Sequence, residues 1–209
     1  MRIRQRHPDA HVFVLLKVKR LLLFIAFGLL ATIPGEILNQ ILARHDLRAF
    51  RSTMISYVIL LFIGFFVGKG LCAVVKKRCH AALANYLFFG TLGLMVEWFL
   101  LGNSPVIDPF QIVVQPGMFT FWATMLLAPW LLMEPSEYFD LRKRFVRYFV
   151  GFSLLYLSIA VLLPREKGGI FLGFVLFATG YVGLNYYFWQ YFKLLRVRDT
   201  LSSEKLPAQ

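Results

Sequence analysis

The sequence predicts an all-α, polytopic integral membrane protein: six transmembrane helices in one bundle, with both termini in the cytoplasm. Hydrophobic residues make up 58% of the 209-residue chain and charged residues 16%, whereas soluble domains average roughly 45–50% and about 25%. The hydrophobic residues are concentrated in long runs, which is typical of membrane-spanning helices. Lysine and arginine are gathered at alternate ends of these runs, as expected for a chain that crosses a membrane repeatedly.

Each run has ~19–25 residues, near the length that crosses roughly 30 Å of hydrocarbon as a helix. We expect Pro34-Gly35-Glu36 to interrupt the first helix, and Ser52 or Thr53 to cap the second. A basic cytoplasmic leader (1–20) should precede the membrane domain (21–192), and a polar cytoplasmic tail (193–209) should follow it. The predicted spans are 21–42, 53–75, 81–101, 109–133, 145–163 and 170–192.

The positive charges predict the orientation. Of the 23 lysines and arginines, 17 fall in the leader, the second and fourth connections and the tail, and five fall in the other connections. Basic residues favour the cytoplasmic side, so we expect a multi-pass protein of a bacterial inner membrane. The same rule accounts for the net charge of +12. No zinc spacing, aromatic RNA-binding motif or basic recognition helix accompanies that charge, so nucleic acid is not an expected partner.

Two acids lie inside otherwise apolar runs. Glu36 and Glu97 both come about 16 residues along helices that run outward, so both should lie roughly 24 Å up, in the outer third of the membrane. A carboxylate at such depth costs up to a few kcal/mol, and the acids should therefore face protein or water. Gly90 and Gly93 share a helical stripe with Glu97. Because small residues let membrane helices approach closely, we expect glycine-lined seams that lead to the acids.

Further oxygen donors accompany the two acids, and the likeliest cavity is expected between the outer ends of the third and fourth helices. Three explanations remain open, of which a purely structural one ranks first: each acid pairs with an outer-loop arginine or with backbone freed at a break. The second is a site for a proton, Na⁺, Mg²⁺ or Ca²⁺, but not for a soft metal. The third is an outward-facing pocket for a polar or lipid-linked ligand. The candidate ligand-binding residues are Glu97, Glu36, Asn39, Asn103, Gln111 and Gln115.

Catalytic motifs are missing from the sequence. The four histidines lie outside the predicted spans, and there is no phosphate-binding glycine loop or nucleophile elbow. We therefore predict no catalytic residue, no metal ligand set and no cofactor. The leading hypothesis is a non-enzymatic accessory or assembly subunit of a membrane complex, whose partners are the lipid bilayer and other membrane protein subunits.

Two alternative functions are retained. The first is a small transporter or channel whose site, built around Glu97 and Glu36, opens to the outer side. The second is an intramembrane lipid-modifying enzyme, because two carboxyl groups can in principle perform acid–base chemistry.

Overall fold

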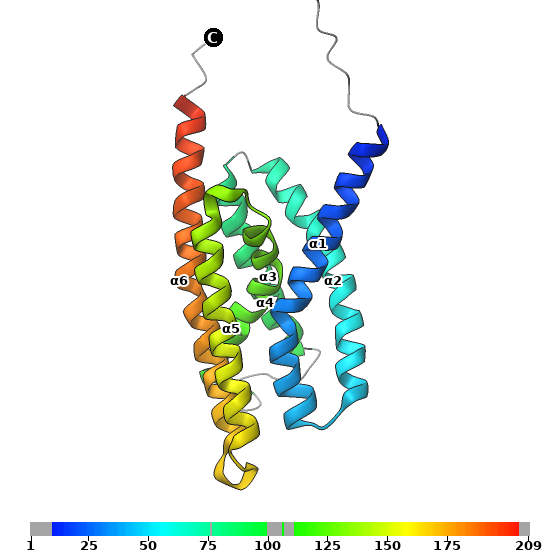
Figure 1. The fold of residues 1–209 in the computed structure, drawn as a ribbon, viewed down its shortest axis with the longest axis vertical. Helices are drawn as coiled ribbons and strands as arrows, with labels where there is room; N and C mark the ends of the chain where they lie inside the picture. The colour runs from blue at the N-terminus through cyan, green and yellow to red at the C-terminus, as the bar shows by residue number, and fades with distance from the viewer. Residues whose placement is uncertain (1–9, 76, 100–105, 107–110, 205–209) are drawn as a thin grey trace, which may run out of the picture.

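The computed structural model describes residues 10–75, 77–99, 106 and 111–204. These residues form a helical bundle (Figure 1), which confirms the predicted all-α class. Six helices are long and apolar enough to cross a membrane, as expected of a multi-pass membrane protein. The elements are α1 (Ala10–Glu36), the π-helix η1 (Ile37–Ala43), α2 (Leu47–Val74), α3 (Arg78–Phe99), α4 (Gln111–Leu132), the 3₁₀ turn η2 (Ser136–Tyr138), α5 (Phe139–Leu162), the 3₁₀ turn η3 (Arg165–Lys167) and α6 (Gly169–Glu204).

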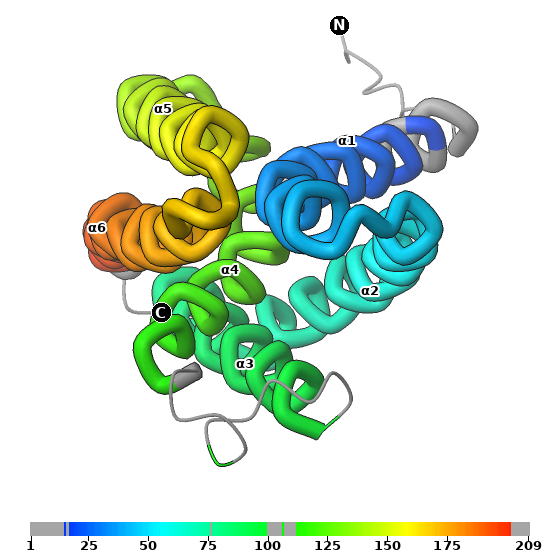
Figure 2. The backbone as a smooth tube through the Cα atoms, turned by 90° about the horizontal axis from the view of Figure 1, so that it is seen from below, coloured from blue at the N-terminus to red at the C-terminus, as the bar shows by residue number. Residues whose placement is uncertain are grey.

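Helix α4 lies at the centre of the bundle. It packs against α1, α2, α3 and α6, and Figure 2 shows these four helices around it, with α5 outside against α6. Residues 121–129 of α4 are all buried. A helix that is apolar on every side is stable only when other helices surround it, so the composition of α4 explains its position.

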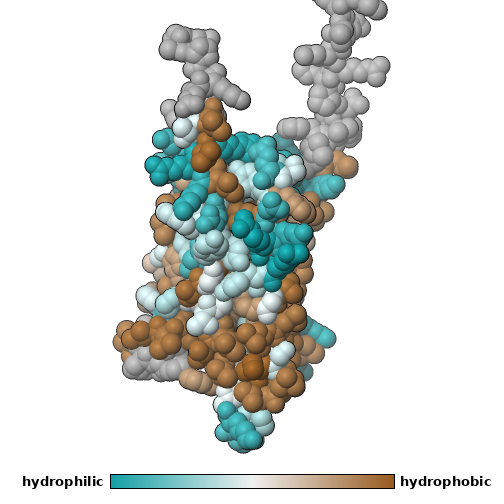
Figure 3. Space-filling model, turned by 60° about the vertical axis from the view of Figure 1, so that its left-hand side comes forward, coloured by the Kyte–Doolittle hydropathy of each residue, from teal (hydrophilic) through white to brown (hydrophobic). Residues whose placement is uncertain are grey.

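The outer surface carries hydrophobic side chains that no other helix covers. Phe62, Phe66 and Leu154 are 47%, 52% and 61% exposed. On the face shown in Figure 3, hydrophobic residues cover much of the lower part, residues of intermediate hydropathy lie in the middle, and hydrophilic residues gather toward the end where α1 begins and α6 ends and at the opposite tip. Large exposed apolar areas mark surfaces that contact lipid or another protein.

The predicted interruption at Pro34-Gly35-Glu36 takes the form of a change of helix type. Helix α1 continues through Pro34 and ends at Glu36, where it passes directly into the π-helix η1. Proline lacks the N–H that would bond four residues back, and a change of helical type is one way in which a membrane helix accommodates this loss. Arg165 donates to the carbonyl oxygens of Leu42 (2.7 Å) and Ala43 (2.8 Å) at the end of η1. Arg165, in the turn between α5 and α6, therefore satisfies helix-end carbonyls.

Two other helix ends differ from the prediction. Helix α2 starts at Leu47, and its N-cap is Asp46, whose carboxylate accepts from Ala49 N at 2.9 Å; the predicted caps Ser52 and Thr53 lie inside the helix. Helix α6 continues to Glu204 rather than ending near residue 192. Its extension still packs on the bundle, because Leu195 is only 2% exposed.

Candidate functional site

Glu36 and Glu97 line one cavity of about 650 Å³, which we call the glutamate pocket. Both acids are buried, at 6% and 4% exposure. The cavity lies among α1–η1, α2, α3, α4 and α6. Its lining includes Arg44 and Ser52, on either side of the turn that joins η1 to α2. The cavity therefore extends toward the end of the bundle where these two elements are joined (Figure 1).

Glu36 is the last residue of α1, where the backbone changes to the π-helix. Its Oε1 accepts a hydrogen bond from Tyr57 Oη of α2 at 2.6 Å. Its Oε2 is buried and has no hydrogen-bond partner within the described residues. The preceding residue, Gly35, leaves room for aromatic rings, since a Cβ there would lie 2.8 Å from Phe177 and 3.0 Å from Phe121. One oxygen of this carboxyl group is thus held by Tyr57, and the Gln40 side chain of η1 lies close to the carboxyl group as well.

Glu97 is positioned by close packing of α3 against α4. A Cβ at Gly93, one turn before Glu97, would lie 2.0 Å from Trp122 Cγ, so the indole ring rests directly on the glycine. From there Trp122 Nε1 donates to Glu97 Oε1 at 3.1 Å. The rings of Trp122 and Tyr57 meet edge to face, with centroids 5.8 Å apart. The aromatic donors of the two acids are therefore in contact with each other.

The pocket would carry an excess of negative charge if both of its acids were ionised. Glu36 and Glu97 lie within electrostatic range of each other, and like charges repel strongly where water is excluded. Of the lining residues that the structure describes, Arg44 is the only basic one, and it is exposed. Buried carboxylates need a compensating positive charge. A proton or a cationic ligand between the acids would supply it.

The remaining lining combines aromatic and hydrogen-bonding groups. Aromatic faces attract cations, and a volume of about 650 Å³ falls within the usual range for small-molecule sites. The arrangement can therefore enclose a ligand that has both a positive charge and an apolar body. The aromatic lining residues are Tyr57, Phe121, Trp122, Phe171, Phe174 and Phe177, and the uncharged polar ones are Asn39, Gln40, Ser52, Thr53 and Ser56.

The other candidate residues have different positions. Asn39 lines the pocket with the two acids. Gln115 does not line it; its Oε1 accepts from Trp98 Nε1 at 2.8 Å. Asn103 and the side chain of Gln111 lie outside the described residues. The cavity also involves more helices than the third and fourth, because α1–η1, α2 and α6 contribute to its walls.

Sequence reasoning missed the two aromatic donors. Tyr57 could have been found, because it shares one buried stripe of α2 with Leu61, Gly64 and Gly68, and this stripe contains the small residues typical of helix contacts. Trp122 carried no comparable signal. Its contact with Glu97 depends on which helix packs against α3, and the sequence does not show that pairing.

The described residues contain no group of three or more His, Cys, Asp or Glu side chains that could hold a metal ion. The pocket is lined by two carboxyl groups, their aromatic donors, and apolar, hydroxyl and amide side chains. No protein-family model, no curated protein and no solved structure matches this chain.

Proposed function

We propose that this chain is a small membrane transporter whose substrate, an organic cation, binds in the glutamate pocket. One observation carries the proposal: two buried acids from separate helices share a single cavity with six aromatic side chains. Carboxylates and aromatic faces are the two kinds of group that attract organic cations in proteins.

The chemistry of the lining favours an organic cation over a hard metal ion. Ca²⁺ takes six to eight oxygen ligands, and Mg²⁺ requires near-ideal octahedral oxygen geometry. Rings of Phe121, Trp122 and Phe177 occupy a large part of this wall, where such ions would need oxygen. The carboxyl groups of Glu36 and Glu97, which both line the cavity, offer a contact for an ammonium-like group.

The orientation follows from the charge distribution. The positive-inside rule favours an orientation with both termini in the cytoplasm, and we propose a bacterial inner membrane as the location. The start of α1 and the end of α6 lie at one end of the bundle (Figure 1), as this orientation requires. The glutamate pocket would then open to the outer side.

A binding measurement tests the proposal. The purified protein in detergent is titrated with tetraphenylphosphonium, an aromatic monovalent cation, in a calorimeter. We expect saturable binding by the wild type. Glu97→Gln and Glu36→Gln should each weaken it by about tenfold or more, equivalent to about 1.4 kcal/mol. Glu166→Gln is the matched control, because it removes an exposed acid from η3, outside the pocket lining.

The accessory-subunit hypothesis, which leads on the sequence alone, becomes the alternative here, and the same variants distinguish it from a transporter. It expects no cation binding by the wild type, and it expects the glutamine variants to lose a co-purifying protein or to express poorly. Wild-type affinity in both well-folded glutamine variants would show that neither acid binds the cation. Uptake of the cation into liposomes that contain the protein, in excess of its passive uptake into protein-free liposomes, then distinguishes a transporter from a protein that only binds it.

A further inference from the structure

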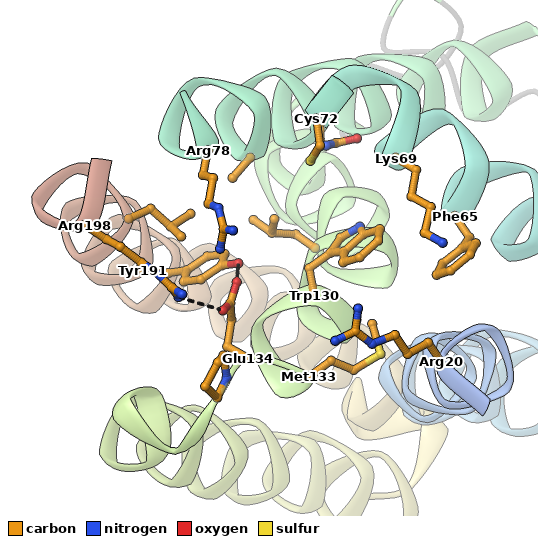
Figure 4. A pocket seen from close by; sticks show the side chains of 15 residues that line it. Arg20, Phe65, Lys69, Cys72, Arg78, Trp130, Met133, Glu134, Tyr191 and Arg198 are labelled. Carbon is orange, nitrogen blue, oxygen red and sulfur yellow. Dashed lines mark hydrogen bonds and ion pairs between the residues drawn. The ribbon is translucent and has the colours of Figure 1, made fainter. Parts of the chain in front are cut away.

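A second cavity lies near the ends of the same helices that carry the termini. It measures about 820 Å³, and we call it the basic pocket. Four cationic side chains from four helices line it: Arg20 of α1, Lys69 of α2, Arg78 of α3 and Arg198 of α6. Figure 4 shows Arg20 and Arg78 reaching toward the space between the helices on either side of Trp130.

One acid lines this pocket within the described part of the chain, and it is already engaged. Glu134 Oε1 accepts from Tyr191 Oη at 2.8 Å, and Glu134 Oε2 lies 3.8 Å from Arg198 Nη1. No ion pair joins Arg20, Lys69 or Arg78 to an acid of the described residues. The pocket therefore has an excess of positive charge that a bound anion would balance.

The interior of the pocket adds a polar contact of another kind. Asn85 is only 4% exposed; its Nδ2 donates to the carbonyl of Ala81 at 3.0 Å. Asn85 is one of the residues that line the pocket, and its Oδ1 is buried without a hydrogen-bond partner among the described residues. A buried amide oxygen without a partner is unfavourable, so a hydrogen-bond donor of a ligand would stabilise it.

The walls between the cations and Asn85 are apolar. The ring of Trp130 stacks on Phe65, with centroids 5.6 Å apart and planes 6° apart, and Leu127 and Leu195 are also part of the lining. Cationic side chains at a membrane interface often only extend toward water. Here they surround a cavity that also contains apolar walls and an unpartnered amide, which is the lining that an amphipathic anion requires.

We propose that the basic pocket binds a phosphate-ester group, and that the headgroup of an anionic phospholipid supplies it. Arg20 and Arg78 lie close to the first residues of their spans and Arg198 close to the last of its span, which is the depth of a lipid headgroup. Basic pockets between membrane helices on the cytoplasmic side suit anionic headgroups, and guanidinium groups match phosphate oxygens in geometry. The proposal does not depend on what the glutamate pocket binds.

Lipid retention tests this assignment. The wild type is reconstituted in equal amounts of phosphatidylglycerol and phosphatidylcholine, extracted in mild detergent, and examined by native mass spectrometry. We expect preferential retention of phosphatidylglycerol. Arg20→Gln combined with Arg78→Gln should lower that retention by about fivefold for each charge removed. Lys143→Gln combined with Arg147→Gln, which removes two exposed charges near the start of α5, should leave it unchanged.

A change of opposite sign sharpens the test. Glu134→Gln removes the one acid from the described lining and should increase phosphatidylglycerol retention, which a merely structural role would not do. In a second experiment, inorganic phosphate or glycerol phosphate is added to the lipid-depleted protein, and the unfolding temperature of the protein is measured. Stabilisation by these soluble anions, lost in the double arginine variant, would support the phosphate site but assign it a soluble ligand.

Two results would overturn the proposal. One is equal retention of both lipids by the wild type with no stabilisation by phosphate; this is measured without any variant. The other is an equal loss of phosphatidylglycerol in the arginine variant and in the α5 control, which would indicate general surface charge.

Discussion

The two pockets lie among the same helices but differ in the sign and the burial of their charged side chains. In the glutamate pocket both acids are buried, and each accepts a hydrogen bond from an aromatic side chain of a neighbouring helix. In the basic pocket Arg20, Lys69 and Arg78 are exposed. Between the two linings, α2 and α4 contribute Leu61 and Met125, which are 0% and 1% exposed.

Because of this difference, charge compensation by a ligand should stabilise the glutamate pocket more than the basic pocket. A buried charge without compensation is unfavourable by several kcal/mol, whereas an exposed cation is solvated and contributes little on its own. The glutamate pocket should therefore be sensitive to single substitutions, and the basic pocket should change by degrees as charges are removed.

The largest effect is expected from Gly93→Leu. A side chain at this position would displace Trp122, and overpacking of this kind costs about 1–3 kcal/mol. The variant should unfold at lower temperature in detergent, and it should lose cation binding, because Trp122 can no longer reach Glu97. Gly70→Leu is the control, since nothing lies within 4 Å of a Cβ there. If Gly93→Leu binds the cation with wild-type affinity, the packing of Trp122 on Gly93 is not required for the binding site.

The second prediction separates the pockets by crossed substitution. Glu97→Gln should lower the affinity for the organic cation by about tenfold or more and leave phosphatidylglycerol retention unchanged. The double variant Arg20→Gln with Arg78→Gln should lower phosphatidylglycerol retention and leave the affinity for the organic cation unchanged. Both ligands are measured on both proteins. If either variant affects both ligands equally, the two cavities do not act as independent sites.

A smaller effect is expected from Tyr57→Phe, which removes only the hydrogen bond to Glu36. Hydrogen bonds between membrane helices contribute about 0.6 kcal/mol on average and up to about 1.7 kcal/mol. The free energy of unfolding should therefore fall by an amount in this range. In the background of Glu36→Gln the same change should have a different effect, because contacting residues are not additive. Additivity across the double-mutant cycle, measured by thermal unfolding, would indicate that the two side chains do not interact.

The smallest effect is a difference in salt dependence. Exposed charges are screened within about 8 Å at physiological ionic strength, whereas buried ones are screened much less. Anion binding in the basic pocket should therefore weaken more steeply with added sodium chloride than cation binding in the glutamate pocket. Titrations of phosphate and of tetraphenylphosphonium over a series of salt concentrations provide the comparison. A steeper slope for the organic cation would contradict the burial contrast.

Much of the fold could be predicted from the sequence, because the thickness of the bilayer sets a minimum length for each apolar run. Helix ends were less predictable. Asp46 caps α2 one turn or more before the expected residues, and α6 extends past its apolar part because Leu195 still packs on the bundle. These ends depend on local hydrogen bonds and tertiary contacts, which the hydrophobic pattern does not record.

For the sites, the sequence was informative where burial carries a cost. Glu36 and Glu97 could be singled out because acids are rare in apolar runs. Their aromatic donors could not, since Trp122 reaches Glu97 only through the packing of α4 on Gly93. The basic pocket was also hidden. In the sequence, each of its basic residues looks like an ordinary charge at a membrane interface. Only the arrangement of the helices brings Arg20, Lys69 and Arg78 together around one cavity.

The central claim is that the two glutamates form one cation site. The most direct test is a crystal structure of the protein soaked with tetraphenylarsonium, whose arsenic atom is located by anomalous scattering. The account predicts an arsenic peak inside the glutamate pocket, between the carboxyl groups of Glu36 and Glu97, that disappears in Glu97→Gln. A peak elsewhere on the molecule, or a peak in the pocket that persists unchanged in that variant, would contradict it.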